Sequence, residues 1–290
     1  MSNEEIFLQS CTDSMEMRKN VKKGYEECFL GIVDILGFSN FVKNNKNAPE
    51  IIVSIIDRAL FNNKNLLDGI EYKILSDTFI VYTKKCTQLY LLNLIFALEN
   101  FSLFCFFEGF LSRGAIVKGS HYIDKKNDIM ISPAFIEAYN IEKKESVYPR
   151  ILIKDEVFDF LIKDSKMDND AFHVGSLVFV KDYIEKDFDN KTVVRPFRNI
   201  EIIAKSIYKN YKDRKGRFFR KNIDEEYLCN ELLRFKQYFD KYISDNKEIE
   251  NHIKEKFNYL AKEFNETLEK CSNRIDVSNF MVKILSVSEE

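Results

Sequence analysis

The 290-residue sequence contains no tryptophan, only four prolines and nine glycines, and no excess of charge of one sign. The low glycine and proline contents exclude a collagen-like or low-complexity chain. Lysine and arginine (44) nearly balance aspartate and glutamate (46), so a protein that coats nucleic acid is not expected. Apolar residues make up 45% of the chain, which excludes intrinsic disorder and allows a full hydrophobic core.

Metal-binding and disulfide motifs built on cysteine and histidine are also missing. The six cysteines form no C-x-x-C pair and the chain has three histidines, so a zinc site is not expected. Residues 1–10 contain two glutamates and no basic segment ahead of an apolar core, which does not fit a secretory signal. Reduced cysteines in a cytoplasmic protein are therefore expected.

One apolar segment, residues 89–107, approaches the length of a membrane span. Four polar residues interrupt it: Asn93, Glu99, Asn100 and Ser102. A carboxylate inside a bilayer is costly. The segment is therefore predicted to be a buried amphipathic helix, and no stable membrane insertion is expected.

The periodicity of apolar residues predicts an α+β fold with a helical C-terminal appendage. Strands are predicted at 29–36, at 70–82 as two strands with a turn at Ser76 and Asp77, and at 111–119, 150–153 and 174–180. Helices are predicted from residue 47, over 87–108, from 132 to about 145, over 155–162, over 225–242 and over 249–270. The order strand, helix, strand, strand, helix, strand is typical of a ferredoxin-like sheet.

The same pattern divides the chain into a lead-in at 1–27, a main domain at 28–186 and a helical region at 187–290. A basic cluster with interleaved aromatic residues spans 205–221. This cluster could hold an anionic partner, or it could be an ordinary solvated face. The apolar repeats of the helical region could form a dimer contact.

The first candidate site residue is Asp34, late in the apolar strand at 29–36 and followed by Gly37. A buried acid is costly unless something pairs with it. Glycine lets backbone N–H groups approach an anion closely. An aspartate that only caps the strand end is the alternative interpretation.

The second candidate is Asp77, at the turn that follows a strand whose polar face carries Glu71 and Lys73. Two carboxylates at the ends of neighbouring strands suit a hard cation. Taken alone, Asp77 would be an ordinary turn residue.

Five motifs in this order resemble the class III nucleotidyl cyclases, and most closely the pyrimidine cyclases of bacterial antiphage defence, the Pycsar systems. They are D-I-L-G-F at 34–38, S-D at 76–77, R-G-A-I-V-K-G at 113–119, S-P-A-F-I-E-A-Y at 132–139 and Y-P-R-I at 148–151. The resemblance implies a ferredoxin-like class III cyclase domain over 28–186 and a homodimer. It also implies Mn2+ or Mg2+, two ions per site, and cyclic UMP or cyclic CMP as a product that activates an effector without direct contact.

The resemblance also implies roles for individual residues. The carboxylates of Asp34 and Asp77 and the Ile35 carbonyl would bind the metal ions. One ion would activate the ribose 3′-hydroxyl for attack on the α-phosphorus, and a second would hold the triphosphate. The backbone N–H groups of Gly37, Phe38 and Ser39 would bind the β- and γ-phosphates.

The chain departs from the family at two positions. Ile136 and Asn140 stand where the family has its transition-state asparagine and arginine. Arg113 and Lys118 are the candidate cations for the α-phosphate, and a structural salt bridge is the alternative for Arg113. The missing pair also motivates a second hypothesis, a catalytically inactive cyclase-like nucleotide sensor that acts through its helical tail.

The base that the site would accept is predicted from Lys73 and Glu71. Lys73 aligns with the position that reads the base in the wider family. Lysine only donates hydrogen bonds, which favours the two carbonyls of uracil, whereas Glu71 could accept from the cytosine amine. A uridylate cyclase using UTP is thus slightly favoured over a cytidylate cyclase using CTP.

Overall fold

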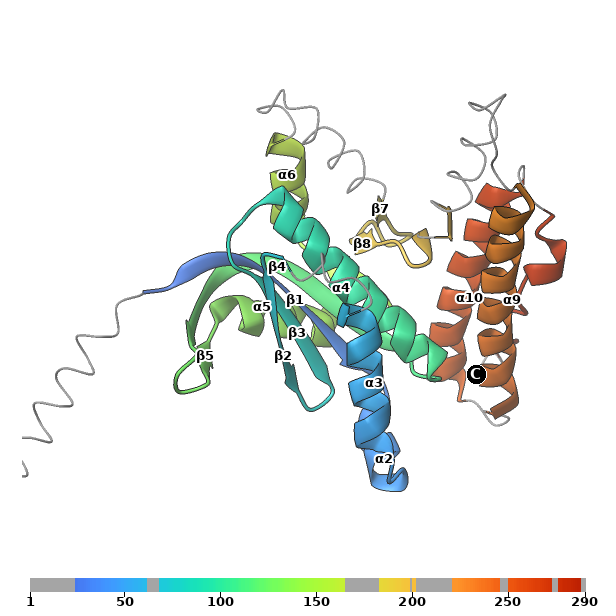
Figure 1. Ribbon diagram of the computed structural model, residues 1–290, viewed down its shortest axis with the longest axis horizontal. Coiled ribbons are helices and arrows are strands. Elements are labelled where there is room, and N and C mark those ends of the chain that lie inside the picture. Colours follow the sequence, from blue (N-terminus) through green and yellow to red (C-terminus); the bar gives the residue numbers. More distant parts are fainter. Residues whose placement is uncertain are drawn as a thin grey trace, which may run out of the picture.

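The computed structural model of the protein describes residues 24–61, 68–164, 183–198, 200–201, 221–245, 250–272 and 276–287. A mixed sheet forms the centre, helices lie on both of its faces, and two long helices stand beside one another next to it (Figure 1). The predicted α+β class is confirmed.

The described residues form eight strands in one sheet. They are β1 (Glu26–Ile35), β2 (Ile70–Leu75), β3 (Thr78–Thr83), β4 (Ser112–Asp124), β5 (Ile129–Ile131), β6 (Ile151–Ile153), β7 (Ile184–Lys186) and β8 (Thr192–Val194). The strand order is β2-β3-β1-β4-β6-β8-β7, and β5 pairs with β4 off this path. β1 lies between β3 and β4, antiparallel to both, which confirms the split β-α-β arrangement predicted from the sequence.

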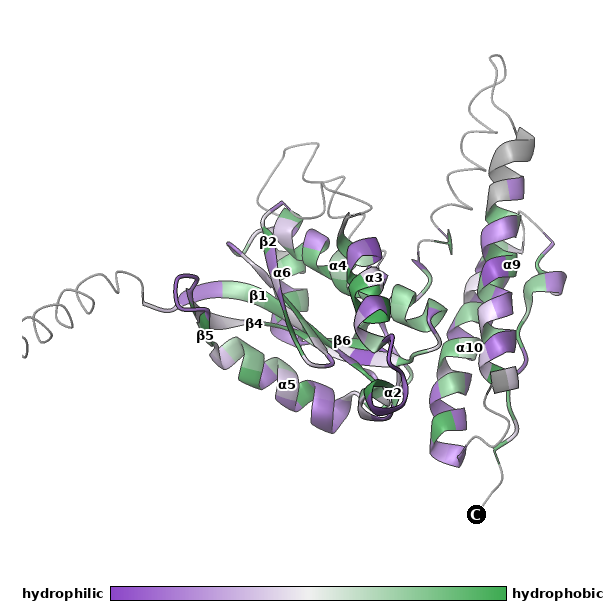
Figure 2. Ribbon diagram, turned by 60° about the horizontal axis from the view of Figure 1, so that its bottom comes forward, coloured by the Kyte–Doolittle hydropathy of each residue, from purple (hydrophilic) through white to green (hydrophobic). Residues whose placement is uncertain are grey.

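Helices cover both faces of the sheet, and two further helices, α9 and α10, stand beside it (Figure 1). The helices are α2 (Phe38–Asn44), α3 (Ala48–Phe61), α4 (Gln88–Phe107), α5 (Pro133–Glu145), α6 (Asp155–Asp164), α9 (Lys221–Asp245) and α10 (Asn251–Cys271), with a short 3-10 turn at Ser278–Phe280. Figure 2 shows α3, α4 and α6 on one side of β1 and β4 and α5 on the other. Strand alternation separates the two cores: Phe29 and Val33 pack with α3 and α4, and Leu30 and Ile32 pack with α5.

The α4 helix is the long apolar segment of the sequence. Its interpretation as a buried helix is confirmed, but the predicted amphipathic character is wrong, because the few polar residues of α4 do not gather on one face and several of them are buried. It contacts the sheet, α3 and α9, and a Cβ on Gly31 of β1 would lie 2.3 Å from a methyl group of Leu98. Its length and composition would also fit a membrane span, but most of it is buried within the fold.

The C-terminal helices α9 and α10 confirm the two helices predicted there. They pack through aromatic side chains, including those of Phe239, Phe257 and Phe264. The chain after the 3-10 turn runs back along α10. The Asn258 side chain forms hydrogen bonds with the backbone C=O and N–H of Leu285 at 2.8 and 2.7 Å. The Asn265 side chain does the same with Val282. These two amide side chains hold the last described segment against α10.

The structure differs from the sequence prediction in several elements. The boundary expected at residue 187, between the main domain and the helical region, lies inside the β7–β8 hairpin. Because β8 pairs with β6, the sheet continues across this boundary. The elements α2, β5, β7 and β8 were not predicted. The strand predicted at 174–180, residues 1–23 of the lead-in and residues 205–220 of the basic cluster lie outside the described residues.

Candidate active site

Two aspartates meet where β1 and β3 lie side by side. Asp34 stands at the end of β1, directly opposite Thr78 of β3 and Arg113 of β4. The β2–β3 turn brings in Asp77, whose backbone carbonyl accepts a hydrogen bond from the Ile35 N–H at 3.2 Å. The structure therefore brings together Asp34, Ile35 and Asp77, the three predicted metal ligands.

Two residues with positive φ shape the backbone around these aspartates. Ser76 has φ 59°, which closes the tight turn between β2 and β3. Gly37 has φ 79° and precedes α2, and no atom lies within 4 Å of the position that a Cβ would take there. The first N–H groups of a helix have no partner within it. The backbone from Gly37 to Ser39 thus has donors and open space for an anion.

A third acid, Glu142 of α5, completes the cluster, and the sequence interpretation missed it. It forms an ion pair with Arg113, with 2.6 Å between the Glu142 Oε1 and the Arg113 Nε, and its side chain is 1% exposed. Arg113 also donates to the Ser146 carbonyl at 3.1 Å. The salt bridge considered as an alternative for Arg113 is therefore present. A signal for Glu142 existed, because it continues the buried stripe Ala134, Ala138 at i+4 spacing.

The acids of this cluster repel one another. Burial, together with the negative charges of Glu142 and Asp77, raises the pKa of Asp34 to about 6, while Lys143 and Arg113 oppose the shift. Burial also raises the pKa of Glu142. Within the part of the chain that the structure describes, no hydrogen bond or ion pair reaches the carboxylate of Asp34 or Asp77.

These acids fit a divalent cation. Oxygen ligands from carboxylates suit Mg2+ and Mn2+, and Mg2+ is commonly bound by one or two carboxylates with substrate phosphates supplying the rest. Asp34 and Asp77 provide such a pair. Among the described residues no group of three or more His, Cys, Asp or Glu side chains is arranged to hold a metal by itself, so a cation here would need further ligands from a substrate or from water.

The two predicted lysines lie on opposite faces of the sheet. Lys73 stands opposite Ile80 of β3, on the α5 face that also carries Asp34, and it forms an ion pair with Asp128 of the β4–β5 turn. Lys118 stands opposite Phe29, on the α3–α4 face, and its ammonium group lies 3.2 Å from Glu27. The assignment of Lys118 to the substrate site is therefore corrected, because the sheet separates it from Asp34.

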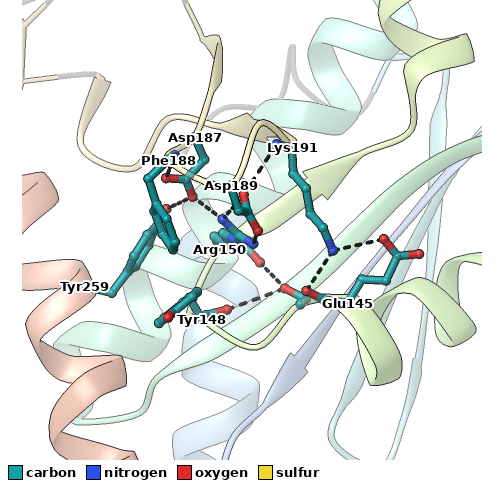
Figure 3. Close-up of polar contacts among 9 residues, drawn as sticks. Glu145, Tyr148, Arg150, Asp187, Phe188, Asp189, Lys191 and Tyr259 are labelled. Atoms are coloured by element: carbon teal, nitrogen blue, oxygen red, sulfur yellow. Dashed lines mark hydrogen bonds and ion pairs between the residues drawn. The ribbon is translucent and has the colours of Figure 1, made fainter.

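The Y-P-R-I motif forms a second polar cluster, shown in Figure 3. The Arg150 side chain is 1% exposed, and its guanidinium group forms ion pairs with Asp187 and Asp189 of the β7–β8 hairpin. The Tyr259 hydroxyl of α10 donates to Asp187 at 2.8 Å, and the ring of Tyr148 stacks on that of Tyr259. This motif thus joins the sheet to the C-terminal helices.

Comparison with known proteins adds weak structural matches only. No family model matches the chain, and no curated protein matches its sequence. The guanylyl cyclase Cya2 is 12% identical with a TM-score of 0.33, over 47% of this chain and 79% of that one. The adenylyl cyclase CyaB from P. aeruginosa is 12% identical with a TM-score of 0.37, over 59% of this chain and 93% of that one.

A third solved structure is a double mutant of the guanylyl cyclase domain of the RhoGC fusion protein from the aquatic fungus Blastocladiella emersonii. It is 12% identical with a TM-score of 0.36, over 59% of this chain and 94% of that one. Scores this low carry no inference about activity or substrate, so the function has to be judged from the site itself.

Proposed function

We propose that the protein is a metal-dependent nucleotide cyclase that converts UTP, or alternatively CTP, into the 3′,5′-cyclic monophosphate and pyrophosphate. The observation that carries the proposal is the pair of half-buried carboxylates of Asp34 and Asp77, which form no hydrogen bond or ion pair with a described residue and lie near an open glycine turn. A buried acid without a partner is costly, and a bound cation would offset that cost.

Each part of the site has a role in this reaction. Asp34 and Asp77 would hold Mn2+ or Mg2+, which when bound lowers the pKa of the ribose 3′-hydroxyl and neutralises phosphate charge. The backbone at Gly37, Phe38 and Ser39 would bind the triphosphate tail. The 3′-oxygen forms a bond to the α-phosphorus while the bond to pyrophosphate breaks, and Arg113 is the cation beside Asp34 for the charge at the α-phosphate.

The base would be read on the polar face of β2. Lys73 is held by Asp128, and Glu71 is held by Lys125 at 2.6 Å and by the Tyr82 hydroxyl at 3.1 Å. Because Glu71 already accepts two hydrogen bonds, Lys73 is the freer of the two to bind a pyrimidine carbonyl. Lys73→Met should therefore reduce the preference for UTP over CTP, measured as the ratio of kcat/KM values, whereas an equal loss for all four triphosphates would remove Lys73 from the base pocket.

The proposal includes a homodimer. The α5 face that carries the site also exposes apolar side chains around β5 and α5, with Ile131 at 51% and Ile136 at 62% exposure. Exposed apolar patches often mark contacts with other chains, and a second copy would cover the half-open site. Sedimentation analysis of active protein tests this, and full activity in a demonstrated monomer would contradict it.

The product is proposed to act as a second messenger in the cytoplasm, activating a separate antiphage effector without direct contact. This role rests on the resemblance of the five sequence motifs to those of the antiphage pyrimidine cyclases. Phage challenge of cells that carry the Asp34→Asn variant would test this role. Unchanged protection by that variant would contradict it.

The central experiment is incubation of purified protein with Mn2+ or Mg2+ and each of the four nucleoside triphosphates. Asp34→Asn and Asp77→Asn should each abolish the cyclic product, since each removes a ligand charge with little change in volume. Asp57→Asn, an exposed acid on α3, is the matched control and should keep full activity. Near-normal turnover in either site variant would contradict the metal assignment.

A specific observation supports the second candidate, an inactive nucleotide sensor. Arg113 is engaged by Glu142 and by the Ser146 carbonyl, so the arginine beside Asp34 is already occupied by protein groups. This candidate predicts that triphosphate binds in a metal-dependent manner, measured by calorimetry, without any cyclic product.

A further inference from the structure

A cavity of about 220 Å³ lies between the sheet and the C-terminal helices, and its lining does not include Asp34 or Asp77. The second half of α4 forms its floor, the ends of β6 and β8 form one side, and α9 and α10 form the other. It therefore lies where the two parts of the described chain meet.

The walls of the cavity are mostly aromatic and aliphatic. Phe106 and Phe107 of α4 face Phe235 and Leu228 of α9, and Phe197 closes one end. These side chains belong to the core that joins α4 to the helical pair. Protein interiors contain few voids larger than a water molecule, and apolar cavities of this order stay dry and accept apolar ligands. An apolar space of this size is therefore suited to a ligand rather than to water.

Two polar groups lie on the α4 side of the cavity. The Ser102 hydroxyl is buried and has no hydrogen-bond partner among the described residues. Glu99, one turn before it, is also in the lining, and burial raises the pKa of its carboxyl to about 8. The raised pKa favours the uncharged form of that carboxyl at neutral pH, so the α4 side of the wall offers hydrogen bonds. The other charged side chains of the lining are paired: Arg150 binds two aspartates of the β7–β8 hairpin, and Glu231 and Arg234 of α9 lie 4.0 Å apart.

The opening carries a charged residue of α9. Arg234 lines the cavity, its side chain is 45% exposed, and its guanidinium stacks over the Phe107 ring at 5.0 Å. A ligand would therefore enter past a solvated cation and place its apolar body among the phenylalanines.

We propose that this cavity is a binding site for a small, monocyclic and mainly apolar molecule with one uncharged hydrogen-bonding group, which meets the Ser102 hydroxyl. The site is separate from the proposed nucleotide site and does not depend on it. A ligand here contacts α4, β6 and α9 together, so it would hold the helical pair against the sheet.

Phenol and toluene are suitable probes, because they share a ring and differ by a hydrogen-bonding hydroxyl. Both should raise the Tm of the full chain at millimolar concentration, since a ligand that binds the folded state stabilises it. Calorimetry should show phenol binding about threefold to tenfold more tightly than toluene, which corresponds to one hydrogen bond. Hydrogen exchange should slow in α4 and α9 when phenol is present.

Two substitutions of Ser102 distinguish the contribution of its hydroxyl to binding from that of the cavity volume. Ser102→Ala should remove the preference for phenol and leave toluene binding unchanged. Ser102→Leu should fill the cavity and abolish binding of both probes, and Leu228→Phe fills it from the opposite wall in case the first variant does not fold. Ser54→Leu, at an exposed serine of α3, is the matched control and should bind both probes as the parent does.

Other results would overturn the assignment. Absence of any Tm increase and of any calorimetric signal with both probes would show that the cavity does not accept such ligands. Binding that persists unchanged in both Ser102→Leu and Leu228→Phe would place the probes elsewhere. Neither readout requires nucleotide turnover, so these results remain separate from the test of the proposed cyclase.

Discussion

Arg113 and Arg150 stand at the same end of two neighbouring parallel strands, and they have different surroundings. The Gly114 N–H donates to the Arg150 carbonyl at 2.9 Å, so the two residues are close along the ladder. Around Arg150, both aspartates are bonded to the guanidinium. Around Arg113, Glu142 is paired with the guanidinium, but Asp34 and Asp77 form no hydrogen bond or ion pair with a described residue.

The pKa values of the acids follow this difference. Hydrogen bonds from Arg150 lower the pKa of Asp189, whereas burial and the neighbouring acids raise that of Asp34 to about 6. A structural ion pair stabilises the charged form of an acid and lowers its pKa. In a cation-binding site without its cation, the charged form is destabilised and the pKa is raised. The comparison separates a cluster that holds the fold together from a cluster suited to a ligand.

Ser146 connects the two clusters. Its carbonyl accepts from Arg113 at 3.1 Å and its hydroxyl donates to the Arg150 carbonyl at 3.0 Å. The α10 helix, through Tyr259 and Asp187, is therefore linked by hydrogen bonds to the residue that faces Asp34. The position of Arg113 depends in part on contacts made by the C-terminal helices.

The largest expected effect is on stability, from the loss of Arg150. Arg150→Ala leaves two buried or half-buried aspartates without their cation and should lower the free energy of unfolding by about 3–5 kcal/mol. Arg58→Ala removes a partly exposed pair with Glu108 and should cost about 1 kcal/mol or less. Chemical denaturation measures both, and equal losses would contradict a structural role specific to Arg150.

Neutralising one aspartate in each cluster should give opposite results. Asp187→Asn weakens charged hydrogen bonds to Arg150 and Tyr259 and should cost about 1.5–3 kcal/mol. Asp34→Asn removes a repelled acid and should leave Tm unchanged or raise it while abolishing turnover. Thermal unfolding decides this, and a clear loss of stability in Asp34→Asn would show that Asp34 has a structural partner.

The pH dependence of stability should differ in sign between the clusters. The folded pKa of Asp34 lies above its unfolded value of 3.8, so its contribution lowers stability as pH rises from about 4 to about 6. The folded pKa of Asp189 is lowered, so its contribution is lost as pH falls below the unfolded value. Denaturation across this range should show the first slope disappearing in Asp34→Asn and persisting in Asp189→Asn.

The smallest expected effect comes from Tyr259. Tyr259→Phe removes the hydroxyl that donates to Asp187 and keeps the ring stacked on Tyr148. The loss should be about 0.5–1.5 kcal/mol, as for a single hydrogen bond. If the link through Ser146 positions Arg113, turnover should also fall in this variant, and a control at the exposed Tyr139 should leave both quantities unchanged.

Local sequence was sufficient for the elements that carry the site. The apolar run of β1 ending in Asp34, the Ser76–Asp77 turn and the Ser132–Pro133 helix start were all predicted, and the Ser132 hydroxyl accepts from the Phe135 N–H at 3.0 Å. Such features depend on residues only a few positions apart, so local pattern specifies them. Alternation could also have excluded Lys118, because an odd separation from Arg113 puts the two on opposite faces.

The sequence by itself determined the strands and helices that build the main sheet from β1 to α6, apart from α2 and β5, as well as the buried α4 and the two aspartates at neighbouring strand ends. Only the tertiary structure decided that Glu142 binds Arg113, that Arg150 binds the β7–β8 hairpin, and that the sheet continues past residue 187. These pairings join residues 29 or more positions apart. Local pattern specifies periodicity and turns, whereas the partner of a buried charge is fixed by which distant elements pack together and exclude water.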